Sequence, residues 1–300
     1  MKEKILTDDF EIIPSHSSVV NEIFQNDFDI TWHDGYRASG STQRVWGIIP
    51  GENAKDDGTI SYHYNNNYFR SDEFVAEHSG RHVLFAGCSE TEGQGGDIES
   101  SWGKILLNKI ENVSGFYNLG KSGYGWQKVI SQLRIYINKY GKPDNLFVLL
   151  PNIGRSIEWS EEDKDWYAKQ FYPRLGPTKA LGFQSMYLSE QSVEQYKKTF
   201  IDFVISWRLF EDFCEAANIK LVWGTWQSID DYNFSKLQLF KNFVPLPKQQ
   251  LPSLIDRYRE NAKLEKFDLD KRDGHHGKLF HEYWADIMFE EAKKKGFLND

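Results

Sequence analysis

The sequence has few cysteines and no excess of basic residues, and both absences exclude classes of protein. Cys88 and Cys214 are the only two cysteines, too few for a disulfide framework and without the C-x-x-C spacing of a zinc site. The formal charge of -8 at pH 7 argues against nucleic acid or an anionic membrane as a partner, because clustered Lys and Arg bind phosphate groups.

Long apolar runs are also missing. The first residues, "MKEKILTDDFEII", lack the apolar segment of about 7 to 15 residues that a signal peptide contains. No window approaches the roughly 18 apolar residues of a membrane span. We therefore expect a soluble protein that is made in the cytoplasm.

From residue 82 onward, short apolar runs alternate with amphipathic ones. The apolar runs predict strands at 83–86, 116–119, 146–150 and 221–224. Apolar residues at helical spacing predict helices over 126–140, 196–217 and 280–292. This alternation is typical of an α/β domain with a mostly parallel sheet between helices.

Three parts of the chain do not follow the alternation. Residues 1–80 are rich in Asn, Asp, Ser and Gly, and we interpret them as an accessory N-terminal segment that packs on a core domain of residues 81–300. Long insertions at about 151–192 and 225–270 each follow a predicted strand. Because ligands bind at the carboxyl ends of the strands in an open α/β sheet, we expect both insertions to serve function.

The string "GFYNLGKS", residues 115–122, matches the phosphate-binding pattern G-x-x-x-x-G-K-[ST]. Such a loop must lie between a strand and a helix, but here the predicted strand 116–119 lies inside the match. Gly123 and Gly125 would also interrupt the first turn of a following helix. We interpret this match as coincidental.

A serine at the end of a predicted strand indicates a different chemistry. In "HVLFAGCSETEGQGG", residues 82–96, an apolar run ends in small and polar residues, with Ser89 at the turn. A serine hydroxyl becomes nucleophilic only with a base, a group that orients the base, and donors for the oxyanion. Near the end of the chain, "RDGHHG" places Asp273 three residues before His276, so that a carboxylate could receive the imidazole Nδ1–H.

These segments together resemble the SGNH, or GDSL-type, hydrolase superfamily of esterases and acetylesterases. "LFAGCSETEG" is similar to its first block, "NLGKSG" to its second, "LLPNIGR" more loosely to its third, and the D-x-x-H turn to its last. The resemblance covers roughly 82–155 and 270–296. It extends to SGNH proteins of uncharacterised type in bacteria and their phages, so the chain could be phage-encoded.

The resemblance implies a flavodoxin-like three-layer α/β/α sandwich and assigns roles to particular residues. Ser89, His276 and Asp273 would form the catalytic triad, and the N–H groups of Ser89 and Gly123 with the Asn152 side chain would form the oxyanion hole. The chain departs from the family at Cys88, which replaces the Asp of G-D-S, and in the third block, where Gly and Asp are missing and a Pro precedes Asn152. No metal or organic cofactor is implied.

Other residues have two interpretations each. His275, His276 and His281 could be metal ligands, but no Cys or carboxylate cluster completes a tetrahedral set. Arg155 could bind an anionic substrate group or pair with a carboxylate of an insertion. Trp159 and Trp226, one in each insertion, could stack on a sugar or fill the core of a lid.

The sequence therefore predicts a serine esterase whose substrate is a small-molecule or polysaccharide ester, with an O-acetylated sugar as the expected class. Two alternatives stay open. One is an O-acyltransferase with the same triad, and the other is an inactive carbohydrate-binding or assembly protein that keeps the fold. The sequence does not indicate an oligomeric state.

Overall fold

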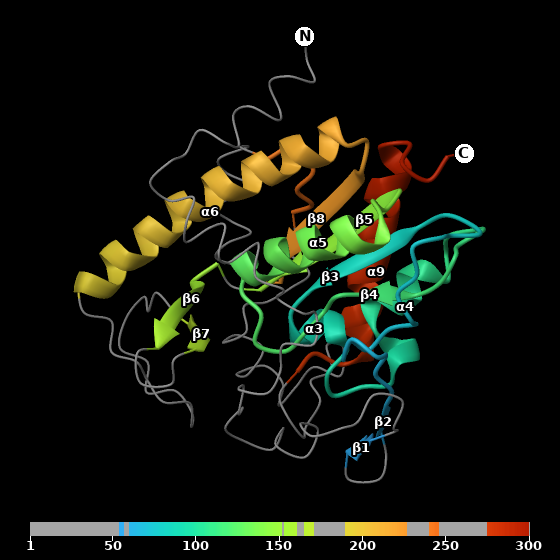
Figure 1. Ribbon diagram of the computed structural model, residues 1–300, viewed down its shortest axis with the longest axis horizontal. Helices are drawn as coiled ribbons and strands as arrows, with labels where there is room; N and C mark the ends of the chain where they lie inside the picture. Colours follow the sequence, from blue (N-terminus) through green and yellow to red (C-terminus); the bar gives the residue numbers. More distant parts are fainter. Residues whose placement is uncertain are drawn as a thin grey trace.

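Four parallel strands form the central sheet of the protein, in the order β4-β3-β5-β8 (Figure 1). The computed structural model describes residues 54–56, 60–151, 153–160, 165–170, 190–226, 240–245 and 275–299. The strands are β3 (Val83–Gly87), β4 (Tyr117–Asn118), β5 (Asn145–Leu150) and β8 (Lys220–Thr225). All four coincide with predicted strands, and β4 lies inside the string that imitates a phosphate loop.

Helices cover both faces of this sheet. Leu84 and Val148 belong to the core cluster beneath α5 (Trp126–Tyr140) and α6 (Glu190–Ala216). Phe85 and Phe147, one position along in each strand, belong to the opposite cluster with α4 (Trp102–Leu107) and α9 (Lys278–Lys294). Because successive side chains of a strand point to opposite faces, nearly continuous apolar strands such as β3 can fill both layers. The fold is the predicted flavodoxin-like three-layer α/β/α sandwich.

The sheet continues beyond β8 by a single parallel bridge between Trp223 and Phe243. The Trp223 N–H donates to the Asn242 carbonyl at 3.1 Å, and the Val244 N–H donates to the Trp223 carbonyl at 2.8 Å. This short segment, which belongs to the second insertion, therefore covers the open edge of β8.

Several short elements are not indicated by the sequence pattern. They are β1 (Ala54–Asp56), β2 (Ile60–Tyr62), α3 (Ser89–Glu92), the 3-10 turn η2 (Ile98–Ser100), β6 (Arg155–Ser160) and β7 (Asp165–Gln170). Strands β6 and β7 pair antiparallel, so the first insertion begins with a hairpin. The shortest have only three or four residues, and β6 and β7, which have six residues each, carry charged and polar residues in place of an apolar run.

Part of the segment before residue 81 packs on the sandwich. Phe69 and Phe74 are buried with the α5 side of the core, and the ring of Phe74 lies 5.0 Å from that of Tyr136. The division into an accessory segment and a core domain stays a prediction. No helix in the part of the chain that the structure describes is long and apolar enough to cross a membrane.

Candidate active site

Ser89 lies just after the carboxyl end of β3, which is where the sequence predicts it. The strand ends at Gly87, the buried Cys88 precedes α3, and Ser89 is the first residue of that helix. A Cβ on Gly87 would overlap the Leu149 carbonyl oxygen and the Thr91 hydroxyl, so only glycine permits this tight turn. Ser89 is 6 % exposed, and its hydroxyl lies 4.0 Å from the Cys88 sulfur.

His276 reaches the same helix from the other end of the chain. Its Nδ1 lies 2.6 Å from Oε1 of Glu90, the residue directly after Ser89. Its ring stacks on Phe280 with centroids 3.9 Å apart, and Trp226 approaches it edge-on at 5.8 Å. Two aromatic contacts and one carboxylate therefore fix the orientation of the imidazole.

The second imidazole nitrogen of His276 is left open. Nε2 is buried and has no hydrogen-bond partner among the described residues, and no hydrogen bond joins it to the Ser89 hydroxyl there. Catalytic hydrogen bonds are often long in a free enzyme and shorten when substrate binds. The structure thus brings His276 to the helix of Ser89 without joining the two side chains directly.

Glu90 also faces a second histidine, His281 on α9. Its Oε2 lies 3.9 Å from His281 Nε2, while His281 Nδ1 accepts a hydrogen bond from the Trp102 backbone N–H at 3.2 Å. A neutral His281 must therefore carry its proton on Nε2, on the side of Glu90. This contact also supplies an acceptor to the first turn of α4.

Burial and neighbouring charges shift the pKa values of Glu90 and His281. Burial raises the pKa of Glu90, but the Coulomb attraction and hydrogen bond of His276 outweigh it and lower the pKa to about 2. Burial lowers the pKa of His281 to about 4 although Glu90 opposes the change. Glu90 is therefore ionised and His281 neutral near pH 7.

The loop after β4 is held against α3 by Asn118. The Asn118 side chain donates to the Thr91 carbonyl at 2.9 Å and accepts the Gly120 N–H at 2.8 Å. Gly120 approaches the backbone of Thr91 so closely that an added Cβ would lie 2.5 Å from the Thr91 carbonyl carbon. The loop leads to Gly123, whose φ of 82° is a conformation that L side chains rarely adopt.

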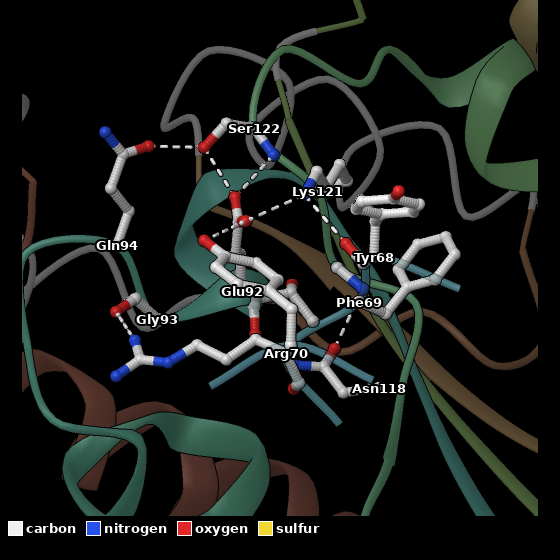
Figure 2. Close-up of polar contacts among 12 residues, drawn as sticks. Tyr68, Phe69, Arg70, Glu92, Gly93, Gln94, Asn118, Lys121 and Ser122 are labelled. Atoms are coloured by element: carbon white, nitrogen blue, oxygen red, sulfur yellow. Dashed lines mark hydrogen bonds and ion pairs between the residues drawn. The ribbon is translucent and has the colours of Figure 1, made fainter. Parts of the chain in front are cut away.

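A buried charge network around Glu92 fixes the same loop (Figure 2). Glu92 Oε2 accepts from the Ser122 backbone N–H at 2.7 Å and the Ser122 hydroxyl at 2.6 Å. Glu92 Oε1 lies 3.5 Å from Lys121 Nζ and accepts from the Tyr64 hydroxyl at 3.2 Å. Burial raises the pKa of Glu92, but Lys121 and Ser122 outweigh it, and the net shift is downward.

This network explains the residues that imitate a phosphate loop. Lys121 is 5 % exposed, and its ammonium group donates to the Tyr68 carbonyl at 2.8 Å besides facing Glu92 (Figure 2). The Lys121 charge is therefore compensated inside the protein by Glu92. Lys121 and Ser122 stabilise the turn after β4.

Arg70, from the segment before the sandwich, supports the turn that follows α3. Its Nη1 donates to the carbonyl oxygens of Gly93, at 2.5 Å, and Gly96, at 2.9 Å. The guanidinium carbon lies 4.2 Å above the Tyr62 ring, and the Tyr62 hydroxyl accepts the Gly95 N–H at 2.9 Å. Residues 62–70 thus help to shape the glycine-rich turn.

The remaining predicted site residues are placed unequally. Asp273 and Asn152 lie outside the described residues, and Trp159 is described only as a position in β6. Trp226 lies beside His276 at the end of β8. Arg155 begins β6, and its backbone carbonyl leaves no room for a side chain on Gly125.

Sequence reasoning misses Glu90, Glu92 and Arg70. The segment "SETE" carries two glutamates within four residues, but nothing in the sequence indicates that they are buried. Their burial is the informative feature, because a carboxylate is costly to bury without a partner. No group of three or more His, Cys, Asp or Glu that could hold a metal ion occurs in the described ranges.

The chain has few similar proteins among those compared with it. No family model matches the chain, and no curated protein matches it. Among solved structures, the crystal structure of protein YxiM from Bacillus subtilis is similar, with 16 % sequence identity and a TM-score of 0.39. The match covers 75 % of this chain and 58 % of YxiM, so the chain spans less than two thirds of that protein.

Proposed function

We propose that the protein is a serine hydrolase of the SGNH type that cleaves an ester through an acyl-enzyme. One observation carries the proposal. The histidine of the D-x-x-H turn, 187 positions after Ser89 by residue number, lies with its Nδ1 at 2.6 Å from the carboxylate of the residue next to that serine. A histidine held by a carboxylate through Nδ1 has Nε2 available as a general base.

In the proposed reaction, His276 Nε2 takes the proton of the Ser89 hydroxyl as Ser89 Oγ attacks the ester carbonyl. The tetrahedral intermediate collapses, the ester C–O bond breaks, and His276 gives its proton to the leaving alcohol. Water then attacks the acyl-enzyme with His276 again as the base, which releases the acid and restores Ser89.

The developing oxyanion requires donors near Ser89. We assign this role to the backbone N–H groups of Ser89 and Gly123, with the Asn152 side chain as a third donor. The network of Glu92, Lys121 and Ser122 supports this assignment. Ser122, the residue directly before Gly123, is fixed because its backbone N–H donates to the buried Glu92 carboxylate at 2.7 Å. Donors that are held rigidly need no reorganisation when charge develops.

For the substrate, we propose an O-acetyl ester of a sugar or polysaccharide. Trp226, beside His276, offers an indole Nε1 that is buried and has no hydrogen-bond partner in the described part of the chain. An aromatic ring with a polar edge suits a sugar face that carries hydroxyl groups. Arg155 and Trp159 are the other proposed contacts of the substrate.

The proposal is tested by acetate release from a panel of O-acetylated mono- and polysaccharides, with p-nitrophenyl acetate as a generic ester. We expect turnover by the wild type and a loss of several orders of magnitude in Ser89→Ala and His276→Ala. The Ser100→Ala variant, which changes a half-buried serine shortly after α3, is the matched control. Folded protein that hydrolyses none of these esters, or a Ser89→Ala variant with full turnover, would contradict the proposal. Adding an acceptor sugar and analysing the products distinguishes hydrolysis from acyl transfer.

A further inference from the structure

The Glu90 carboxylate occupies the place that the family resemblance gives to Asp273. We propose that Glu90, the residue directly after the nucleophile, is the positioning residue of His276. The inference rests on the proposed function, and it moves the third member of the triad from the histidine loop to the helix of the serine.

Glu90 and His276 form a close, buried pair. His276 Nδ1 and Glu90 Oε1 are 2.6 Å apart, and the two side chains are 2 % and 4 % exposed. An imidazole Nδ1 carries one proton, and a carboxylate at this distance is its acceptor. Any other carboxylate would have to displace Glu90 to receive the same proton.

The ionic neighbours of Glu90 favour the same role. The ionic contacts of Glu90 in the described part of the chain are to His276 and His281, and neither Lys nor Arg is among them. His281 is neutral near pH 7 because burial lowers its pKa to about 4, and its Nδ1 accepts the Trp102 N–H. The imidazolium that forms when His276 takes a proton would therefore be the cation nearest to a buried carboxylate, which stabilises it strongly.

Glu90 is also joined to the nucleophile by the chain itself. Ser89 and Glu90 are consecutive residues of α3, and Asn118 fixes that helix by accepting from Gly120 and donating to Thr91. The nucleophile and the carboxylate that orients its base then move as one unit. His276 is positioned against this unit by Phe280, from its own helix, and by Trp226.

The test is the NMR spectrum of protein labelled with 15N-histidine. An imidazole N–H that donates to a buried carboxylate gives a far-downfield proton resonance, which His276→Gln identifies by its loss. We expect the resonance in the wild type, in Asp273→Asn and in the exposed control Glu111→Gln, and its loss in Glu90→Gln. A resonance that persists in Glu90→Gln or disappears in Asp273→Asn would overturn the inference.

Turnover provides the second readout. Replacing the carboxylate that orients a catalytic histidine by its amide costs roughly 10⁴-fold in the serine-protease example, and we expect Glu90→Gln to lose at least 100-fold in kcat with KM nearly unchanged. An unchanged kcat in folded Glu90→Gln would overturn the inference. The NMR signal needs no hydrolysis, so an inactive wild type whose resonance follows Glu90 would remove the proposed function alone.

Glu90→Gln could fail to fold, because it leaves two buried imidazoles without their carboxylate. Circular dichroism and thermal unfolding check each variant first. If Glu90→Gln does not fold, the Asp273→Asn spectrum decides: a retained resonance supports Glu90, and a lost one assigns the histidine to Asp273.

Discussion

At the scale of single residues, the proposed chemistry depends on backbone geometry as much as on side chains. Gly87 allows β3 to turn sharply into the helix of Ser89, and Gly123 holds a positive φ in the loop that follows β4. A substitution at Gly123 therefore separates two effects, the strain that any side chain adds and the loss of an oxyanion donor.

We expect Gly123→Ala to lower the free energy of unfolding by about 1 to 2 kcal/mol and esterase turnover by at least 10-fold. Gly141→Ala is the matched control, because Gly141 has a φ of 94° and an added Cβ there has nothing within 4 Å. Gly141 has a ψ of 164°, a backbone region that other residues almost never occupy, so Gly141→Ala also carries strain. Urea unfolding measures the strain of each variant, and we expect turnover to fall in Gly123→Ala alone. Equal turnover in the two variants would show that the Gly123 N–H does not act in the reaction.

The Trp226 ring gives a second prediction at this scale. It lies 5.8 Å from the His276 ring and is partly exposed at the end of β8. We expect Trp226→Phe to keep the ring contact but to raise KM for a sugar ester, because the indole N–H is lost, while kcat for p-nitrophenyl acetate stays within about three-fold. A parallel loss of activity on both substrates would indicate that Trp226 only positions His276.

At the scale of elements, two turns at the carboxyl edge of the sheet form one unit. The turn after β3 carries Ser89, Glu90 and Glu92, and the turn after β4 carries Lys121 and Ser122. The ion pair between Glu92 and Lys121 joins them, with side chains 5 % and 7 % exposed. A buried pair of this kind destabilises the protein when one partner is removed, because the other charge stays buried.

We expect Lys121→Met to cost roughly 3 to 5 kcal/mol of unfolding free energy. The double variant Glu92→Gln/Lys121→Met removes the uncompensated carboxylate and keeps an acceptor for Ser122, so it should regain at least about 1 kcal/mol. Denaturant unfolding of the wild type, both single variants and the double variant gives the coupling energy. A double variant whose loss of stability equals the sum of the two single losses would show that the pair is not coupled.

The long elements of the sandwich could be predicted from the sequence. The four strands and the three long helices follow from apolar runs and helical spacing, and the three-layer fold is confirmed. Helices α3 and α4 have four and six residues, too few for a period to emerge, and are held by tertiary contacts such as His281 to the Trp102 N–H.

The site was less predictable than the fold. Spacing along the chain indicates Ser89 and His276, but it cannot show which carboxylate reaches Nδ1, because Glu90 and His276 are 186 residues apart. The roles of Ser89, Asp273, Gly123 and Asn152 stay predictions.

At the scale of the whole molecule, buried histidines couple stability to pH. The pKa of His281 falls from 6.5 in an exposed histidine to about 4, chiefly through burial. Between these values the unfolded chain binds a proton that the native protein does not, so stability falls as pH falls from about 6.5 to about 4. Glu90 acts at lower pH, because its stabilising contribution is lost as pH falls from about 4.5, the usual pKa of a glutamate, to about 2.

We therefore expect wild-type protein to lose roughly 1 to 2 kcal/mol more stability between pH 7 and pH 5 than His281→Asn does. Asparagine retains an acceptor for the Trp102 N–H but does not titrate. Urea unfolding at the two pH values measures the difference, and the other histidines contribute equally to both proteins. The same pH dependence in wild type and variant would place the acid sensitivity elsewhere.

The proposed chemistry requires Ser89 to be an activated nucleophile. The most direct measurement is the intact mass of wild type, Ser89→Ala and His276→Ala after incubation with a fluorophosphonate, which reacts with activated serines. We predict one adduct on the wild type, none on Ser89→Ala, and strongly slowed labelling of His276→Ala. Folded wild-type protein without an adduct, or an adduct that persists on Ser89→Ala, would contradict the account.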